Sequence, residues 1–130
     1  MAELEPIDML YDEAIARHRS GDTDAAIEML RHLLAQSPNY SLAHNALSAL
    51  YSRQGKIDQA IEHAARVCEI DPDDSFGPTI LSTLCLKNGR REEAEEALMK
   101  ANQLRQAAWL KNLREQQQRQ EQENESRKQE

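Results

Sequence analysis

The chain has 130 residues, one domain's worth, and 30% of them are charged. No run approaches the roughly 18 apolar residues of a membrane helix, and the first five residues lack the apolar segment of a secretory signal. We therefore expect a cytoplasmic protein without membrane insertion. The net charge of −7 is uneven, because residues 1–104 carry 10 Lys+Arg against 18 Asp+Glu. Nucleic acid repels such an acidic body, so we do not expect nucleic-acid binding.

The first predicted elements are two helices over residues 7–19 and 23–36, with Gly21 between them. The glycine ends the first helix, because a left-handed residue at that position costs glycine no Cβ clash. Asp24 lies in the first turn of the second helix, where a negative charge is stabilised by the helix dipole. Residues 1–6 are expected to be frayed.

The same pattern predicts two more helix pairs. Pro38 and Pro72 end the second helix of the first two pairs. Ser41 and Ser75 are expected N-caps for the helices that follow these prolines. The four further helices are predicted over residues 41–54, 57–70, 75–88 and 91–104.

The tail, residues 105–130, contains seven Gln and neither Gly nor Pro. We favour one long helix from about Arg91 to about Glu121, because nothing in the tail would stop it. The alternative is a break near Asn102 followed by a separate capping helix. No apolar residue follows Leu113, so we expect the last part to be solvated and frayed.

Three residue types recur at one period of 34 residues. The markers are Gly21, Gly55 and Gly89; Ala26, Ala60 and Ala94; and Pro38 with Pro72. Agreement between independent residue types makes chance an unlikely explanation. The pattern therefore predicts that each unit of the repeat consists of two helices joined by a tight turn.

With this spacing the sequence resembles the tetratricopeptide repeat family over residues 7–106. The middle unit matches the family pattern best, through Leu47, Ser48, Tyr51, Gly55, Ala60, Ile61 and Asp71-Pro72. The end units depart from it, with Glu13 and Arg17 in the first and Pro78 and Cys85 in the third. Atypical end units are normal in repeat arrays, because each lacks one neighbour.

The resemblance implies an all-α fold, in which antiparallel helix pairs stack into a right-handed superhelix with an extended C-terminal helix. It divides the chain into three units, about 7–40, 41–74 and 75–106, and a helical extension over 107–130. It also implies a protein-interaction module without catalytic activity, which binds a peptide or helical segment of a partner protein in its concave groove.

In this family the first helix of each unit lines the concave face. The first unit then presents Asp8, Tyr11, Ile15, His18 and Arg19; the second Leu42, Asn45, Ala49, Ser52 and Arg53; the third Phe76, Thr79, Thr83, Leu86 and Lys87. Leu42 and Phe76 would belong to an apolar strip for a partner segment, or else pack between repeats. Arg19, Arg53 and Lys87 would form a basic column for an acidic residue, or else a solvated edge.

One family function can be tested on these positions. Some members bind the C-terminal carboxylate of chaperones through Lys, Asn and Arg at set places. Those places hold Tyr11, Ile15, Ala46, Phe76 and Ile80 here, and none of these side chains supplies the required donors. We therefore do not expect a chaperone-tail clamp.

The sequence offers little for catalysis, and we expect no enzyme, no cofactor and no metal site. The histidines are His18, His32, His44 and His63, and no two lie four residues apart with a third ligand. Cys68 and Cys85 form no CxxC motif. We expect both to be reduced core residues, on neighbouring helices where a disulfide is geometrically conceivable.

A second hypothesis concerns Trp109, Leu110 and Leu113, the last large apolar residues of the chain. They would cover the end of the last unit, or contact a partner or a second copy, since aromatic residues are enriched at binding hot spots. Three repeats are the minimum for a stable array, so an extra interface would help. The alternative function is thus a structural scaffold that dimerises through the last repeat and the C-terminal helix.

Overall fold

The computed structural model describes residues 6–129. Within that range the chain forms six α-helices and no strand. The helices are α1 (Ile7–Arg19), α2 (Thr23–Gln36), α3 (Ser41–Arg53), α4 (Ile57–Ile70), α5 (Phe76–Lys87) and α6 (Arg91–Lys128). For five of the six helices, both ends agree with the predicted range to within one residue. The expectation for the N-terminus falls almost entirely on residues outside the described range.

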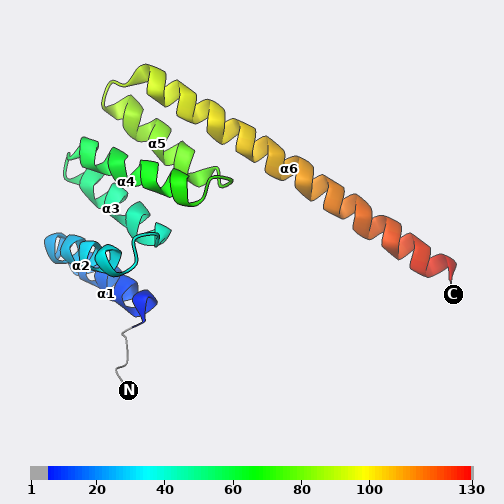
Figure 1. Cartoon of the computed structure of the whole chain (residues 1–130), viewed down its shortest axis with the longest axis horizontal. Helices are drawn as coiled ribbons and strands as arrows, with labels where there is room; N and C mark the ends of the chain where they lie inside the picture. Colours follow the sequence, from blue (N-terminus) through cyan, green and yellow to red (C-terminus); the bar gives the residue numbers. More distant parts are fainter. Residues whose placement is uncertain (1–5, 130) are drawn as a thin grey trace.

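Consecutive helices form three pairs, and the pairs stack side by side. Contacts within the pairs α1–α2, α3–α4 and α5–α6 are the most extensive, and α2–α3 and α4–α5 join one pair to the next. Figure 1 shows this stack, with the second half of α6 leaving it and running away from the other helices. The all-α solenoid predicted from the repeat is therefore confirmed.

The turns inside the pairs depend on glycines in the left-handed region. Gly21, Gly55 and Gly89 have φ angles of 97°, 79° and 74°, which other residues rarely adopt. In each turn the following residue donates its backbone N–H to the carbonyl five residues earlier, as Lys56 does to Tyr51 at 2.9 Å. The same closed turn thus reverses the chain in all three units.

The core lies between the helices of each pair and between neighbouring pairs. Ala26, Ala60 and Ala94 are buried at the start of the second helices, where a small side chain lets two helices approach closely. Leu30 and Leu33 are completely buried in this core. Burying one leucine contributes about 1.5–3 kcal/mol, so these two residues stabilise the stack.

Hydrogen bonds between side chains also link one unit to the next with the period of the repeat. Gln54 donates to Asp24 at 3.2 Å, and Asn88 donates to Asp58 at 3.0 Å. Both acceptors lie in the first turn of a second helix, and both donors follow the first helix of the next unit. Arg90 adds an ion pair with Asp58 at 2.9 Å.

Helix α6 confirms the favoured interpretation of the tail as one long helix, because it continues without a break past Asn102. It ends at Lys128, seven residues beyond the predicted Glu121, so the stretch that was expected to fray is helical. Gln, Glu and Arg are good helix formers. Glu115 and Glu123 each precede an arginine by four residues, an order that stabilises an exposed helix.

The expected serine caps are confirmed only in part. Ser75 occupies the N-cap position of α5, but its side chain makes no capping bond. Ser41 is instead the first residue of α3, whose N-cap is Tyr40. The side chain of Asp74 accepts the N–H of Phe76 at 3.0 Å instead. A carboxylate accepts a hydrogen bond more strongly than a hydroxyl, so the acid one residue earlier provides the bond at the start of α5.

Candidate functional site

The main candidate site is a hollow of about 340 Å³ between α3 and α5. The structure brings seven of the predicted groove residues together here, four from α3 and three from α5. These are Asn45, Ala49, Ser52 and Arg53 with Thr79, Thr83 and Lys87. Residues one repeat apart therefore do face a shared space, because consecutive first helices lie side by side in the stack.

The first unit contributes a separate hollow of about 670 Å³, which Tyr11, Ile15 and Arg19 line. Part of this region is engaged in internal contacts. Tyr11 packs against Tyr40 with ring centroids 5.8 Å apart, and the hydroxyl of Tyr40 donates to Asp8 at 2.6 Å. That hydrogen bond to a carboxylate raises the pKa of Tyr40 to about 12.

The predicted basic column is divided between the two hollows. Arg53 and Lys87 line the hollow between α3 and α5, whereas Arg19 lies in the hollow on α1. Arg53 donates to Nε2 of His18 at 3.0 Å, and the other nitrogen of His18 lies 3.1 Å from the hydroxyl of Thr23. An arginine can only donate, so His18 accepts at Nε2 and donates at Nδ1.

The apolar members of the predicted groove are largely exposed. Leu42 and Phe76 are 51% and 50% exposed, and Leu86 is 64% exposed. Leu42 and Phe76 each lie near the start of their helix, eleven residues before Arg53 and Lys87. At 1.5 Å per residue this separation is about 16 Å, so α3 and α5 each have an apolar end and a basic end.

Sequence reasoning missed the floor of this hollow, which Ser48, Ile80 and Leu84 form. Ser48 is 1% exposed, and its hydroxyl has no hydrogen-bond partner within the described range. Its position in the repeat indicated only a small side chain that lets two helices pack. The signal available in the sequence was that this small residue is polar, whereas its equivalent in the first unit is Ala14.

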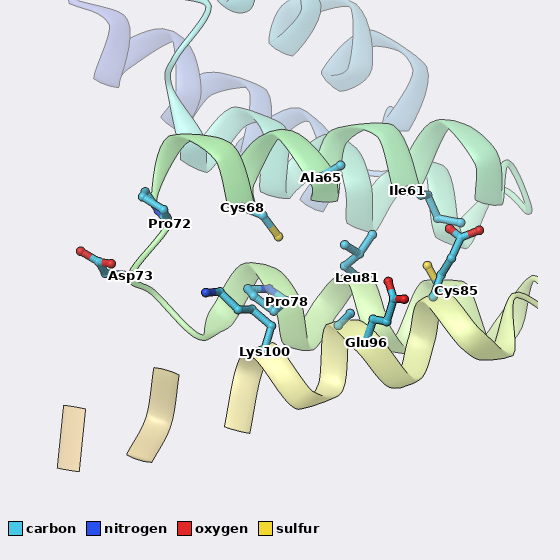
Figure 2. A pocket seen from close by; sticks show the side chains of 12 residues that line it. Ile61, Ala65, Cys68, Pro72, Asp73, Pro78, Leu81, Cys85, Glu96 and Lys100 are labelled. Atoms are coloured by element: carbon cyan, nitrogen blue, oxygen red, sulfur yellow. The ribbon is translucent and has the colours of Figure 1, made fainter. Parts of the chain in front are cut away.

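A second cleft, of about 550 Å³, lies where α4, α5 and the start of α6 meet (Figure 2). Its walls are mainly apolar, with Leu81 between the two cysteines and Ile61 beside Cys85, and Glu96 and Lys100 line it from α6. No sequence pattern predicted this cleft.

Both cysteines of this cleft are free thiols, and they face different parts of it. The sulfur of Cys68 lies 3.0 Å from the place where a Cβ on Gly77 would sit. Cys85 lies eight residues after Gly77 on α5, which is about 12 Å along the helix axis. Burial raises the pKa of both thiols, so they are protonated at neutral pH and are weak nucleophiles.

Two of the histidines form a structural pair between α3 and α4. Nδ1 of His44 lies 3.0 Å from Nδ1 of His63, and Nε2 of His44 donates to the carbonyl of Pro38 at 2.8 Å. His63 also stacks on Tyr51. Burial, and then the neighbouring His44 and Arg31, lower the pKa of His63 to about 4, so it is neutral at pH 7.

Within residues 6–129 no three His, Cys, Asp or Glu side chains gather closely enough to hold a metal ion. Across the same range no helix is both long and apolar enough to cross a bilayer.

Helix pairs that stack with a 34-residue period define the class of helical repeat proteins. More specifically, the chain belongs to the tetratricopeptide repeat family, whose models match residues 17–75 and 79–107. Membership of this family supports a protein-interaction role and points away from catalysis. No curated protein matches the chain in a sequence comparison.

Solved structures share the fold. MamA has 24% identity and a TM-score of 0.74 over 78% of this chain, which spans only 60% of MamA. The secretion translocator chaperone SycD of Yersinia enterocolitica, in complex with a peptide of the translocator YopD, has 24% identity and a TM-score of 0.71. That match covers 78% of this chain and 79% of SycD. The CopN–Scc3 complex has 21% identity and a TM-score of 0.69, over 73% of this chain and 56% of the matched one.

Proposed function

We propose that the chain binds a short segment of a partner protein, extended or helical, along the inner helices α3 and α5. The observation that carries this proposal is the hollow between these helices, which residues from two successive units line together. A space shared by two units can bind a ligand across the repeat, and peptide recognition by helical arrays uses such surfaces.

The two ends of the groove select different chemistry. Leu42 and Phe76, each about half exposed, offer anchors for apolar side chains at one end. The basic end lies about 16 Å away, a distance that about five residues of an extended peptide span. The ligand is therefore a segment with apolar residues at one end and a hydrogen-bonding or acidic residue at the other.

The basic end favours a single acidic residue. His18 holds one N–H of the Arg53 guanidinium, which leaves further N–H donors for a carboxylate. Lys87 lines the same hollow and adds a second positive charge. The surrounding body has an excess of acidic residues, so a ligand with a run of acidic residues would be repelled before it reached this end.

A solved relative in fold gives the proposal a precedent. SycD has been crystallised with a peptide of YopD, so a stack of this shape can hold a peptide in at least one protein. At 24% identity the likeness concerns the fold, and the ligand of this chain follows from its own side chains.

The test is to select binders from a displayed peptide library on the folded chain, and to measure the best peptide by calorimetric titration. We expect Leu42→Ala combined with Phe76→Ala to weaken binding about tenfold or more, because exposed apolar anchors dominate such interfaces. Met9→Ala is the matched control, since Met9 is 63% exposed on α1 and outside the predicted groove rows. Equal losses in both variants, or none in either, would overturn the proposal.

A second pair of substitutions tests the basic end. Arg53→Gln combined with Lys87→Gln should remove any preference for an acidic residue in the selected peptides, while apolar anchoring continues. An unchanged preference in this variant would show that the acidic residue binds elsewhere.

A further inference from the structure

Helix α6 carries a second apolar face that nothing in the described chain covers. Its buried face consists of Ala94, Ala97 and Ala101, which pack against the body. Its exposed large apolar residues are Leu98, Met99, Trp109, Leu110 and Leu113. At 3.6 residues per turn, the exposed set is centred roughly 130° around the helix from the buried set.

The uncovered face begins where the stack expects another layer. Leu98 occupies the place of Leu30 in the first unit, two repeats earlier, and of Ala64 in the second unit, one repeat earlier. Those two residues are 0% and 1% exposed, because the next unit packs on them, whereas Leu98 is 46% exposed. The apolar face of α6 is thus continuous with the surface through which units of this protein contact one another.

The charges of α6 are segregated along the same helix. Residues 91–97 contain four Glu and one Arg, whereas residues 105–119 contain four Lys or Arg and one Glu. Two such helices attract each other when they run antiparallel, because the acidic segment of each then lies beside the basic segment of the other.

We propose that α6 is a homodimerisation helix, which pairs antiparallel with α6 of a second copy across a two-fold axis. Leu98 and Met99 of each copy pack against Leu110 and Leu113 of the other, and Glu96 lies opposite Arg114. In an antiparallel pair, the numbers of two opposed residues have a constant sum. The three pairs Leu98–Leu113, Met99–Leu110 and Glu96–Arg114 agree in this sum to within about one residue, so they require the same register. Apolar contacts and charge pairing therefore select one arrangement, as a self-complementary two-fold interface requires.

This arrangement also accounts for the length of α6. Every described residue after Leu104 is exposed, so the second half of the helix has no support from its own chain. Isolated helices are marginal in water, and most helical stability in proteins comes from packing of an apolar face. The second copy supplies that packing. The interface lies on α6, outside the groove, so the proposal is independent of peptide binding.

Sedimentation velocity on the full chain, over a wide range of concentrations, tests the proposal. We expect a concentration-dependent dimer, and we expect Leu110→Ser combined with Leu113→Ser to raise its dissociation constant about tenfold or more. Gln118→Ser is the matched control on the same helix, outside the apolar face. A wild-type chain that stays monomeric throughout, or a dimer that the double variant does not weaken, would overturn the proposal.

A charge exchange tests the register. Glu96→Arg and Arg114→Glu should each weaken the dimer about fivefold, because each places like charges together at both symmetric contacts. The chain with both changes should regain wild-type affinity, because the opposite charges meet again. Failure of the double change to restore affinity would contradict this register, and circular dichroism of each variant establishes that it is folded.

Discussion

Leu30 and Leu98 occupy the same place in two units, yet one is completely buried and the other is 46% exposed. The difference comes from the neighbours and not from the residue. Leu30 is covered by the next helix pair, while Leu98 lies at the end of the stack on a helix that continues alone. This repeat position is therefore stabilised by the unit that follows it, as nearest-neighbour models of repeat proteins describe.

Truncating both leucines gives the largest expected contrast. Leu30→Ala should lower the free energy of unfolding by about 2–5 kcal/mol, because it leaves a cavity in a closed contact. Leu98→Ala should lower it by about 1 kcal/mol or less in the monomer, since part of that side chain is already in water. Urea unfolding at low protein concentration measures both values, and similar losses would contradict the comparison.

Proline substitutions compare the packed and projecting parts of α6. Ala97→Pro should cost about 3 kcal/mol or more, because it breaks the helix where it packs on the body. Gln117→Pro should reduce the helical signal in circular dichroism but leave unfolding of the body almost unchanged. A large loss of body stability from Gln117→Pro would mean that the projecting part supports the stack directly.

Acid should lower the free energy of unfolding through His63, by less than the Leu30→Ala and Ala97→Pro substitutions do. Its pKa of about 4 in the folded chain is below the ordinary value of 6.5, so the unfolded chain takes up a proton first as the pH falls. The stability from neutral His63 is complete above about pH 6.5 and is lost as the pH falls towards 4. With partial exposure allowed for, the loss should be about 1–2 kcal/mol.

The variant His63→Gln should remove this part of the pH dependence. His32→Gln is the control, because His32 is exposed and its side chain bonds to Gln36 on its own helix. Urea unfolding at neutral and acidic pH gives the slope for each protein. If His63→Gln retained the wild-type slope, the pH dependence would have to come from other groups.

The sequence predicted the stack because its signals are local and periodic. A glycine at each turn, a small residue at each close approach and a proline after each pair repeat at one spacing, so each unit supports the interpretation of the others. The end of α6 was harder to predict, because its second half has no turn residue and no apolar pattern. The small helix preferences of Gln, Glu and Arg, summed over many residues, extend it to Lys128.

The candidate site was less predictable than the fold. The bond between His18 and Arg53 joins residues 35 positions apart, and His44 meets His63 across 19. Such contacts depend on how two helices pack and which rotamers result, and no spacing rule in the sequence encodes them. The same holds for Ser48. The repeat pattern predicts that this residue is buried, but it does not predict that its hydroxyl lacks a hydrogen-bond partner within the described residues.

The recurring bonds from Gln54 to Asp24 and from Asn88 to Asp58 bear on the mechanics of the molecule. They lie at the turns, outside the core, and each one spans the junction between two units. If the ends of the stack were pulled apart, the force would act on these exposed bonds between units before it acted on the hydrogen bonds inside the helices.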